Sequence, residues 1–184
     1  ATGVLALDGL QPLIGGVAEV ERVPRTATAT TVLDVVAVSA SSDAVVEGYD
    51  AAQAADERKD TFYRNSDGVG AGLVYSLAEP AFVTGVRLTA SDQSDRGRTP
   101  DAYELYGSNG DGSWAADDWT LVRRAEVNLG SDWFAEAEDW FGSAQAYQHY
   151  KVVFTSLIND DADAVELADV DLLGTALEPM HPGV

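Results

Sequence analysis

Carboxylate and hydroxyl side chains with the spacing of a cation site occur at Asp56, Asp60 and Thr61. Ca²⁺ is bound by several carboxylate and carbonyl oxygens in a loop that can wrap around the ion. We therefore expect a calcium site here, the alternative being that Asp60 only caps a short helix. A second acidic group, at 160–163, is typical of a solvated loop or of a secondary calcium site.

Aromatic and arginine side chains in predicted loops could bind a sugar. A pyranose presents a C–H face that an exposed ring covers, and hydroxyls that Arg, Asn, Asp or His can bond. Trp114 follows Asp-Gly-Ser, which places it at a loop tip, and Arg96, Arg98, Asn65 and Trp133 lie in the other long connections. An alternative for the two arginines is pairing with their acidic neighbours, Asp92, Asp95 and Asp101.

No pattern of nucleophile and base predicts catalysis. The sequence has no Cys, and its two His residues are His149, within a strand pattern, and His181, near the end. Neither lies in the local context of a Ser-His-Asp arrangement. A glycosidase pair cannot be argued by counting among 31 acidic residues. We predict that the chain is not an enzyme.

The charge balance excludes some partners. Asp and Glu number 31 against 11 Lys and Arg, giving a formal net charge of −20. Nucleic-acid binding and adhesion to anionic membranes both depend on Lys and Arg, so neither is expected. No apolar run is long enough to span a bilayer, so no membrane insertion is expected. The lack of Cys and an opening Ala-Thr-Gly without Met fit a processed protein that is secreted or at the cell surface.

The elements that must position these residues are mostly strands. β-rich runs punctuated by Gly, Pro, Asn and Asp are typical of an all-β sandwich. Predicted strands are 31–39, 72–76, 81–90, 102–108, 119–125, 149–156 and 165–174. Short helices are predicted at 51–60 and 133–140. Alternation places several side chains in the core, namely Tyr103, Leu105, Trp119, Leu121, Tyr150, Val152 and Phe154.

The chain divides into three parts by composition. Residues 1–30 form an apolar, Gly-rich tail, residues 31–175 the sandwich, and residues 176–184 a short C-terminal tail. The first tail either folds back on the sandwich or lies on another chain, where it could add a strand to an open sheet edge.

One long motif carries a family resemblance. The run RGRTPDAYELYGSNGDGSW followed by DWTLV (96–122) joins GLVYSLAEPAFVTGVRLTASD (72–92) and the closing segments YQHYKVVFTS and VELADVDLLG. Together they resemble the discoidin-like, coagulation-factor C-type (galactose-binding-like) domains, which include carbohydrate-binding modules of secreted bacterial proteins. The resemblance implies an antiparallel two-sheet jelly-roll sandwich with short helical segments in its loops.

The resemblance also implies how calcium would be held. In that family a structural Ca²⁺ joins the 56–61 loop to a Glu on the last strand, which here looks like Glu166. The match is partial, since Asp56-Glu57-Arg58 stands where the family often has Asp-Gly-Asp, and the Arg58 side chain offers no oxygen. Glu166 would otherwise be an ordinary solvent-exposed residue.

Two functions follow as expectations. The first is a non-catalytic extracellular module that binds a glycan or related surface ligand and is stabilised by calcium. The alternative is a structural subunit of an extracellular filament, sheath or surface layer. That subunit would form homo-oligomers or polymers through residues 1–30.

Overall fold

Strands are the dominant regular element of the computed structural model, which describes residues 30–92 and 94–177. The helical segments are two single turns of 3₁₀ helix, η1 (Ala51–Ala55) and η2 (Arg96–Arg98). The strands are β1 (Thr31–Val32), β2 (Val35–Ala40), β3 (Tyr63–Asn65), β4 (Gly72–Thr89), β5 (Pro100–Ser108), β6 (Thr120–Glu126), β7 (Glu136–Trp140), β8 (Tyr147–Leu157), β9 (Val165–Leu167) and β10 (Asp169–Ala176). The predicted all-β class is confirmed.

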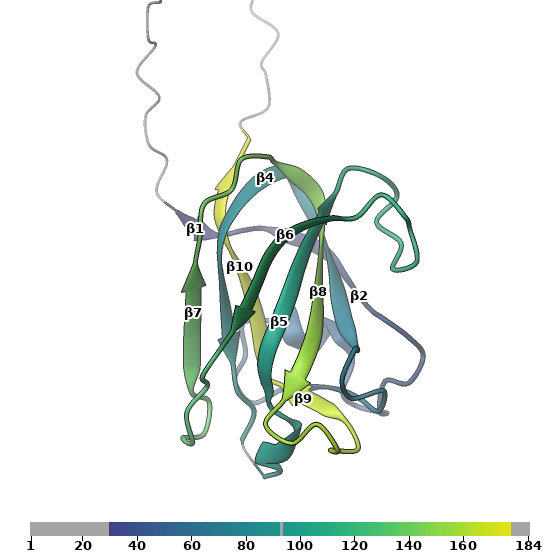
Figure 1. Cartoon of the computed structure of the whole chain (residues 1–184), viewed down its shortest axis with the longest axis vertical. Helices are drawn as coiled ribbons and strands as arrows, with labels where there is room; N and C mark the ends of the chain where they lie inside the picture. The colour runs from purple at the N-terminus through teal and green to yellow at the C-terminus, as the bar shows by residue number, and fades with distance from the viewer. Residues whose placement is uncertain (1–29, 93, 178–184) are drawn as a thin grey trace, which may run out of the picture.

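Strand β4 belongs to both layers of the sandwich. Its first part, up to Leu77, pairs with β2 and β8, whereas its second part, from Ala81, pairs with β10 and β7. One layer therefore has the order β2-β4-β8-β5-β6 and the other β1-β10-β4-β7, with antiparallel pairing throughout (Figure 1). The two strands predicted at 72–76 and 81–90 are thus one bent strand, whose register shifts between Ser76 and Ala81.

Alternating side chains fill the space between the layers. On β8, Tyr150, Val152 and Phe154 are fully buried, as are Tyr103 and Leu105 on the neighbouring β5. Successive residues of a strand point to opposite faces, so this inner row follows directly from the sequence pattern. These five core predictions are confirmed.

Trp119 and Leu121 were expected in the core, and this expectation is wrong. Leu121 is 46 % exposed, and Trp119 is half-buried outside the core cluster. Leu105 of β5 pairs with Arg123 of β6, but the next residue of β5, Tyr106, pairs with Leu121. Val122 is therefore an extra, unpaired residue on β6. Such a β-bulge reverses the alternation that follows it, which places Leu121 on the outer face.

The helix predicted at 133–140 is also wrong. Residues Glu136–Trp140 form β7, which pairs with β4 from Gly85 to Thr89. The sequence EAEDW is rich in helix formers, but the ladder with β4 overrides this weak local preference. The helix predicted at 51–60 is shorter than expected, being only the turn η1.

Candidate functional site

Four loops meet at the end of the sandwich drawn lowest in Figure 1, where η2 and β9 lie. The first is 66–71, the second is 90–99 without residue 93, and the others are 127–135 and 158–164. Main-chain hydrogen bonds join them across the sequence. The Phe134 N–H donates to the Ser91 carbonyl at 3.1 Å, and the Asn159 N–H donates to the Gly97 carbonyl at 3.0 Å. We call this surface the loop end, and a rigid scaffold presents its side chains.

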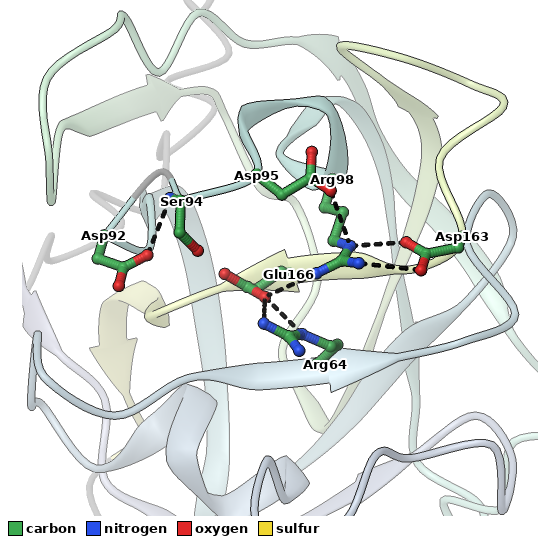
Figure 2. A network of polar contacts seen from close by, with 7 residues as sticks. All are labelled: Arg64, Asp92, Ser94, Asp95, Arg98, Asp163 and Glu166. Carbon is green, nitrogen blue, oxygen red and sulfur yellow. Dashed lines mark hydrogen bonds and ion pairs between the residues drawn. The ribbon is translucent and has the colours of Figure 1, made fainter.

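A charged network centred on Glu166 fixes the middle of the loop end (Figure 2). Glu166 lies on β9 and is 1 % exposed, and its Oε2 accepts a hydrogen bond from Arg64 Nε of β3 at 2.5 Å. Arg98 Nη1 lies 3.9 Å from the same oxygen. Arg98 also donates two bonds to Asp163, of 2.7 and 2.9 Å, and its Nε lies 3.3 Å from Asp95. Paired, hydrogen-bonded charges of this kind hold the loops in one arrangement.

The two predicted arginines therefore have different surroundings. Arg98 is mostly buried and pairs with Asp163 and Asp95, in agreement with the alternative interpretation for this residue. The hydrogen bonds that Arg98 donates to Asp163 raise the pKa of Arg98, and burial, which lowers it, is the smaller effect. Arg96 is exposed, and no carboxylate of the described chain pairs with it. It is the arginine that remains available to a ligand.

Trp133 is the most exposed large apolar side chain of the described residues, at 71 %. The next residue, Phe134, has a positive φ of 57° and stacks on Phe62 with 6.4 Å between ring centroids. Phe134 thus anchors the loop while Trp133 faces solvent. An exposed indole on an anchored loop is a typical binding feature, since most tryptophans are well buried.

Trp114 does not lie at the loop end. The connection from β5 to β6 is drawn at the upper right of Figure 1, away from η2 and β9. Lys151 Nζ lies 5.1 Å from the Trp114 ring, 4.7 Å from the Trp119 ring and 5.2 Å from the Tyr106 ring. These cation–π contacts hold Trp114 half-buried on the outer face of the sheet.

Asn65 is at the loop end but is fully buried. Its Oδ1 accepts a hydrogen bond from the Asp67 N–H at 2.9 Å, and its Nδ2 donates to the Ser42 hydroxyl at 3.3 Å. Asn65 therefore shapes its own turn, as Asn often does.

The predicted calcium ligands fall into separate groups. Asp56 accepts a hydrogen bond from the Thr61 hydroxyl at 2.8 Å, and Asp60 pairs with Arg58 at 2.9 Å. Glu166 instead faces the arginines of the loop end. Within 30–92 and 94–177, no three His, Asp or Glu side chains are grouped so that they could hold a metal. A calcium ion at the 56–61 loop would therefore need main-chain oxygens as well.

Asp169 is a buried carboxylate that sequence reasoning missed. It lies on β10, is 5 % exposed, and its Oδ1 has no hydrogen-bond partner in the described structure. Burial raises its pKa to about 7, and the nearby carboxylates of Asp171, Asp56 and Glu57 add to this effect. The 56–61 loop lies beside Asp169, since Glu57 and Lys59 line one cleft with it. The sequence feature that could have revealed it is the pair of acidic residues at 169 and 171 in an otherwise apolar strand, because buried carboxylates need a partner.

Comparisons with known proteins support the fold. No family model and no curated protein matches the sequence. The chain is similar in structure to the family 32 carbohydrate-binding module of Clostridium perfringens NanJ, in complex with galactose. The TM-score is 0.58 and the identity 17 %, over 74 % of this chain and 92 % of that one.

Two further solved modules give the same picture. One is the C. perfringens module CpGH89CBM32-5, in complex with GalNAc-β-1,3-galactose, with a TM-score of 0.59 and 14 % identity over 76 % of this chain and 94 % of that one. The other is the family 32 module of AlyQ, in complex with 4,5-unsaturated mannuronic acid. Its TM-score is 0.58 and its identity 16 %, over 77 % of this chain and 97 % of that one. The chain therefore has the galactose-binding-like jelly-roll fold of the family 32 carbohydrate-binding modules.

Proposed function

We propose that this protein is a non-catalytic module that binds a neutral glycan at its loop end. The observation that carries the proposal is Trp133, 71 % exposed on a loop that Phe134 anchors. A ring held in this way can cover the C–H face of a pyranose with little loss of side-chain entropy.

Polar groups of the other loops supply the hydrogen bonds that a sugar also needs. Arg96 is exposed and can donate, and the side chain of Asp163 is 73 % exposed and can accept. Asp163 is already oriented by Arg98, and Arg98 by its contacts with Asp95 and Glu166. These groups lie on loops of the same end as Trp133, and donors and acceptors combined with an exposed aromatic ring are the usual composition of a small-ligand site.

The ligand class follows from the solved modules and from the charge. The NanJ and CpGH89CBM32-5 structures contain galactose and GalNAc-β-1,3-galactose, whereas the AlyQ module holds an unsaturated uronic acid. A net charge of −20 disfavours acidic sugars. Galactose and N-acetylgalactosamine are therefore the first ligands to test.

A glycan array with the wild-type protein and two variants tests this proposal. Trp133→Ala is expected to lose the signals of short glycans that end in galactose or N-acetylgalactosamine, the ligands proposed for the loop end. Trp114→Ala, which removes a ring far from the loop end, is expected to keep them. Signals that persist in Trp133→Ala and vanish in Trp114→Ala would place the site elsewhere, and an array without signals above background would refute glycan binding.

We also propose that calcium stabilises the module at the 56–61 loop, with Asp169 as the partner carboxylate on β10. Asp169, Asp171 and Glu57 line a cleft of about 200 Å³ together with Lys59 and Arg87. These carboxylates do not form a complete ligand set by themselves, so main-chain oxygens of the loop would complete the site. A divalent cation there would compensate the buried charge of Asp169, whose pKa is raised first by burial and then by the neighbouring carboxylates. When bound, the ion would supply a positive charge that ties the loop to the sheet.

Thermal unfolding with Ca²⁺ or with EDTA tests the calcium proposal. Ca²⁺ binds only the folded state, so the unfolding temperature is expected to rise by about 3 °C or more at saturating ion. Asp169→Asn should abolish this increase, and Asp117→Asn, an exposed carboxylate of the β5–β6 loop, should keep it. Equal unfolding temperatures of the wild type in Ca²⁺ and EDTA would contradict the proposal.

We propose an extracellular location on the acidity and the absence of Cys. No helix of the described chain has the length and apolar character that crossing a membrane requires. The assembly alternative depends on residues 1–30, of which 1–29 lie outside the described residues.

A further inference from the structure

A second tryptophan lies flat on the sheet formed by β1, β10, β4 and β7. Trp140 is the last residue of β7 and pairs with Gly85 of β4. A Cβ added to Gly85 would lie 2.8, 3.1 and 3.2 Å from three consecutive atoms of the Trp140 ring. Such similar distances occur when a point lies above the face of a ring, because an approach from the edge leaves the flanking atoms farther away. One face of the indole therefore rests on Gly85.

The opposite face of this indole is open to solvent within residues 30–92 and 94–177. Trp140 is 53 % exposed even though its inner face covers Gly85. Its Nε1 donates to Glu138 Oε2 at 3.0 Å, which fixes the rotation of the ring. The absence of a side chain at Gly85 is what permits this position. The result is a flat, oriented and solvent-facing aromatic surface on a rigid sheet.

A row of polar side chains lies beside the ring. Glu138 of β7, Arg87 of β4 and Asp171 of β10 are cross-strand neighbours on this outer face. Arg87 Nε donates to Asp171 at 2.8 Å, and Arg87 Nη1 lies 3.8 Å from Glu138. Side chains two residues apart on a strand are about 7 Å apart, so this row lies within reach of a sugar stacked on Trp140. The cleft of about 200 Å³ begins at Arg87 and Asp171.

We infer that Trp140 and the row of Glu138, Arg87 and Asp171 form a second glycan-binding site, separate from the loop end. The ring covers the C–H face of a neutral pyranose, and the row offers carboxylate acceptors and guanidinium donors to its hydroxyls. The row has two carboxylates and one arginine, which disfavours acidic sugars. The apolar part is a single ring between charged residues, which suits a sugar better than the larger apolar core of a protein interface.

This site rests on contacts of β4, β7 and β10 alone. It stands whether or not the loop end binds a glycan. If both sites are present, one chain can contact a polysaccharide at two places, which raises its apparent affinity for polymers over that for single sugars.

Affinity electrophoresis of the full chain in gels containing galactan, xylan, pullulan or hydroxyethylcellulose tests the second site. At least one of these neutral polymers is expected to retard the wild type, and the Trp133→Ala variant should still be retarded by it. Trp140→Ala should weaken this binding by about tenfold or more, as loss of a central tryptophan does. Gly85→Ala should do so too, because its Cβ lifts the ring while all four tryptophans remain.

Leu121→Ala is the matched control, since it removes an exposed apolar side chain from the other sheet and should leave mobility unchanged. Circular dichroism of each variant verifies folding. Retardation of Trp140→Ala equal to that of the wild type, or no retardation of the wild type by any polymer, would overturn the second site. A mass in light scattering that falls from dimer to monomer in Trp140→Ala would also overturn it, because the ring would then bind another copy of the chain.

Discussion

At the scale of single residues, paired charges do most of the positioning. Glu166 was expected to bind calcium, but it is buried between Arg64 and Arg98 and orders the loop end. The sequence shows a carboxylate near the last strand but not which loop faces it. That partner depends on the pairing of β3 with β9, which places Arg64 opposite Glu166.

A second residue-scale pair predicts a pH dependence. The pKa of Glu104 lies below its ordinary value of 4.5. The main cause is a hydrogen bond that the Tyr106 hydroxyl donates to the carboxylate, and Arg124 adds to it by donating from Nε to Glu104 Oε1 at 2.6 Å. A lowered pKa in the folded state stabilises the protein above the unfolded value, and this contribution is lost as the pH falls through the folded value.

We therefore expect Glu104→Gln to reduce the free energy of unfolding by about 1 kcal/mol at pH 7, a modest value because Arg124 is largely exposed to solvent. The difference from the wild type should shrink below pH 4.5. Urea denaturation at pH 7 and near pH 3 measures it, with Glu126→Gln at the exposed end of β6 as control. A difference that is constant with pH would contradict this assignment.

At the scale of elements, local pattern and tertiary pairing disagree in two instructive places. The composition of residues 136–140 predicts a helix, yet they form β7. They do so because the second part of β4, which pairs with β10 on one side, can pair with another strand on its other side. Trp119 and Leu121 keep the alternation of a core strand, yet the bulge at Val122 turns them outward. By contrast, Tyr150, Val152 and Phe154 follow their pattern, because β8 lies between two partners that fix its register.

The β5–β6 loop gives an element-scale prediction. Lys151 holds this loop by its contacts with the Trp114 and Trp119 rings and by a 3.3 Å hydrogen bond to the Trp114 carbonyl. Lys151→Met retains the apolar stem but removes the charge. We expect a loss of about 1 kcal/mol in unfolding free energy. Amide hydrogen exchange in residues 113–119 should become faster, and exchange equal to that of the wild type would show that the lysine does not hold the loop.

At the scale of the whole molecule, the sequence motifs predict the fold better than the sites. The run at 96–122 spans β5 and the start of β6, and the jelly roll it implies is the fold observed. The predicted ligand-binding residues, however, separate in space. Arg96, Arg98 and Trp133 lie at the loop end, Asn65 is buried beneath it, and Trp114 lies on an outer face. Spacing along the chain cannot show which end of a sandwich a loop reaches.

The structure also shows which of the many carboxylates have a positively charged partner. Several carboxylates are engaged by arginines, as at Glu104, Asp139, Asp163, Glu166 and Asp171. Asp169 has no such partner for its Oδ1 among residues 30–92 and 94–177. The excess negative charge disfavours acidic ligands. Asp169 is the carboxylate whose charged form a bound cation would stabilise most.

The central claim is glycan binding at Trp133, and NMR of the four indole N–H signals tests it most directly. The signals are assigned with single substitutions and followed during titration with galactose and with N-acetylgalactosamine. We expect a saturable shift of the Trp133 signal with at least one of these sugars, while the Trp114 and Trp119 signals stay fixed. The Trp140 signal reports on the separate second site. A Trp133 signal that moves with neither sugar, or shifts confined to Trp114 and Trp119, would contradict glycan binding at the loop end.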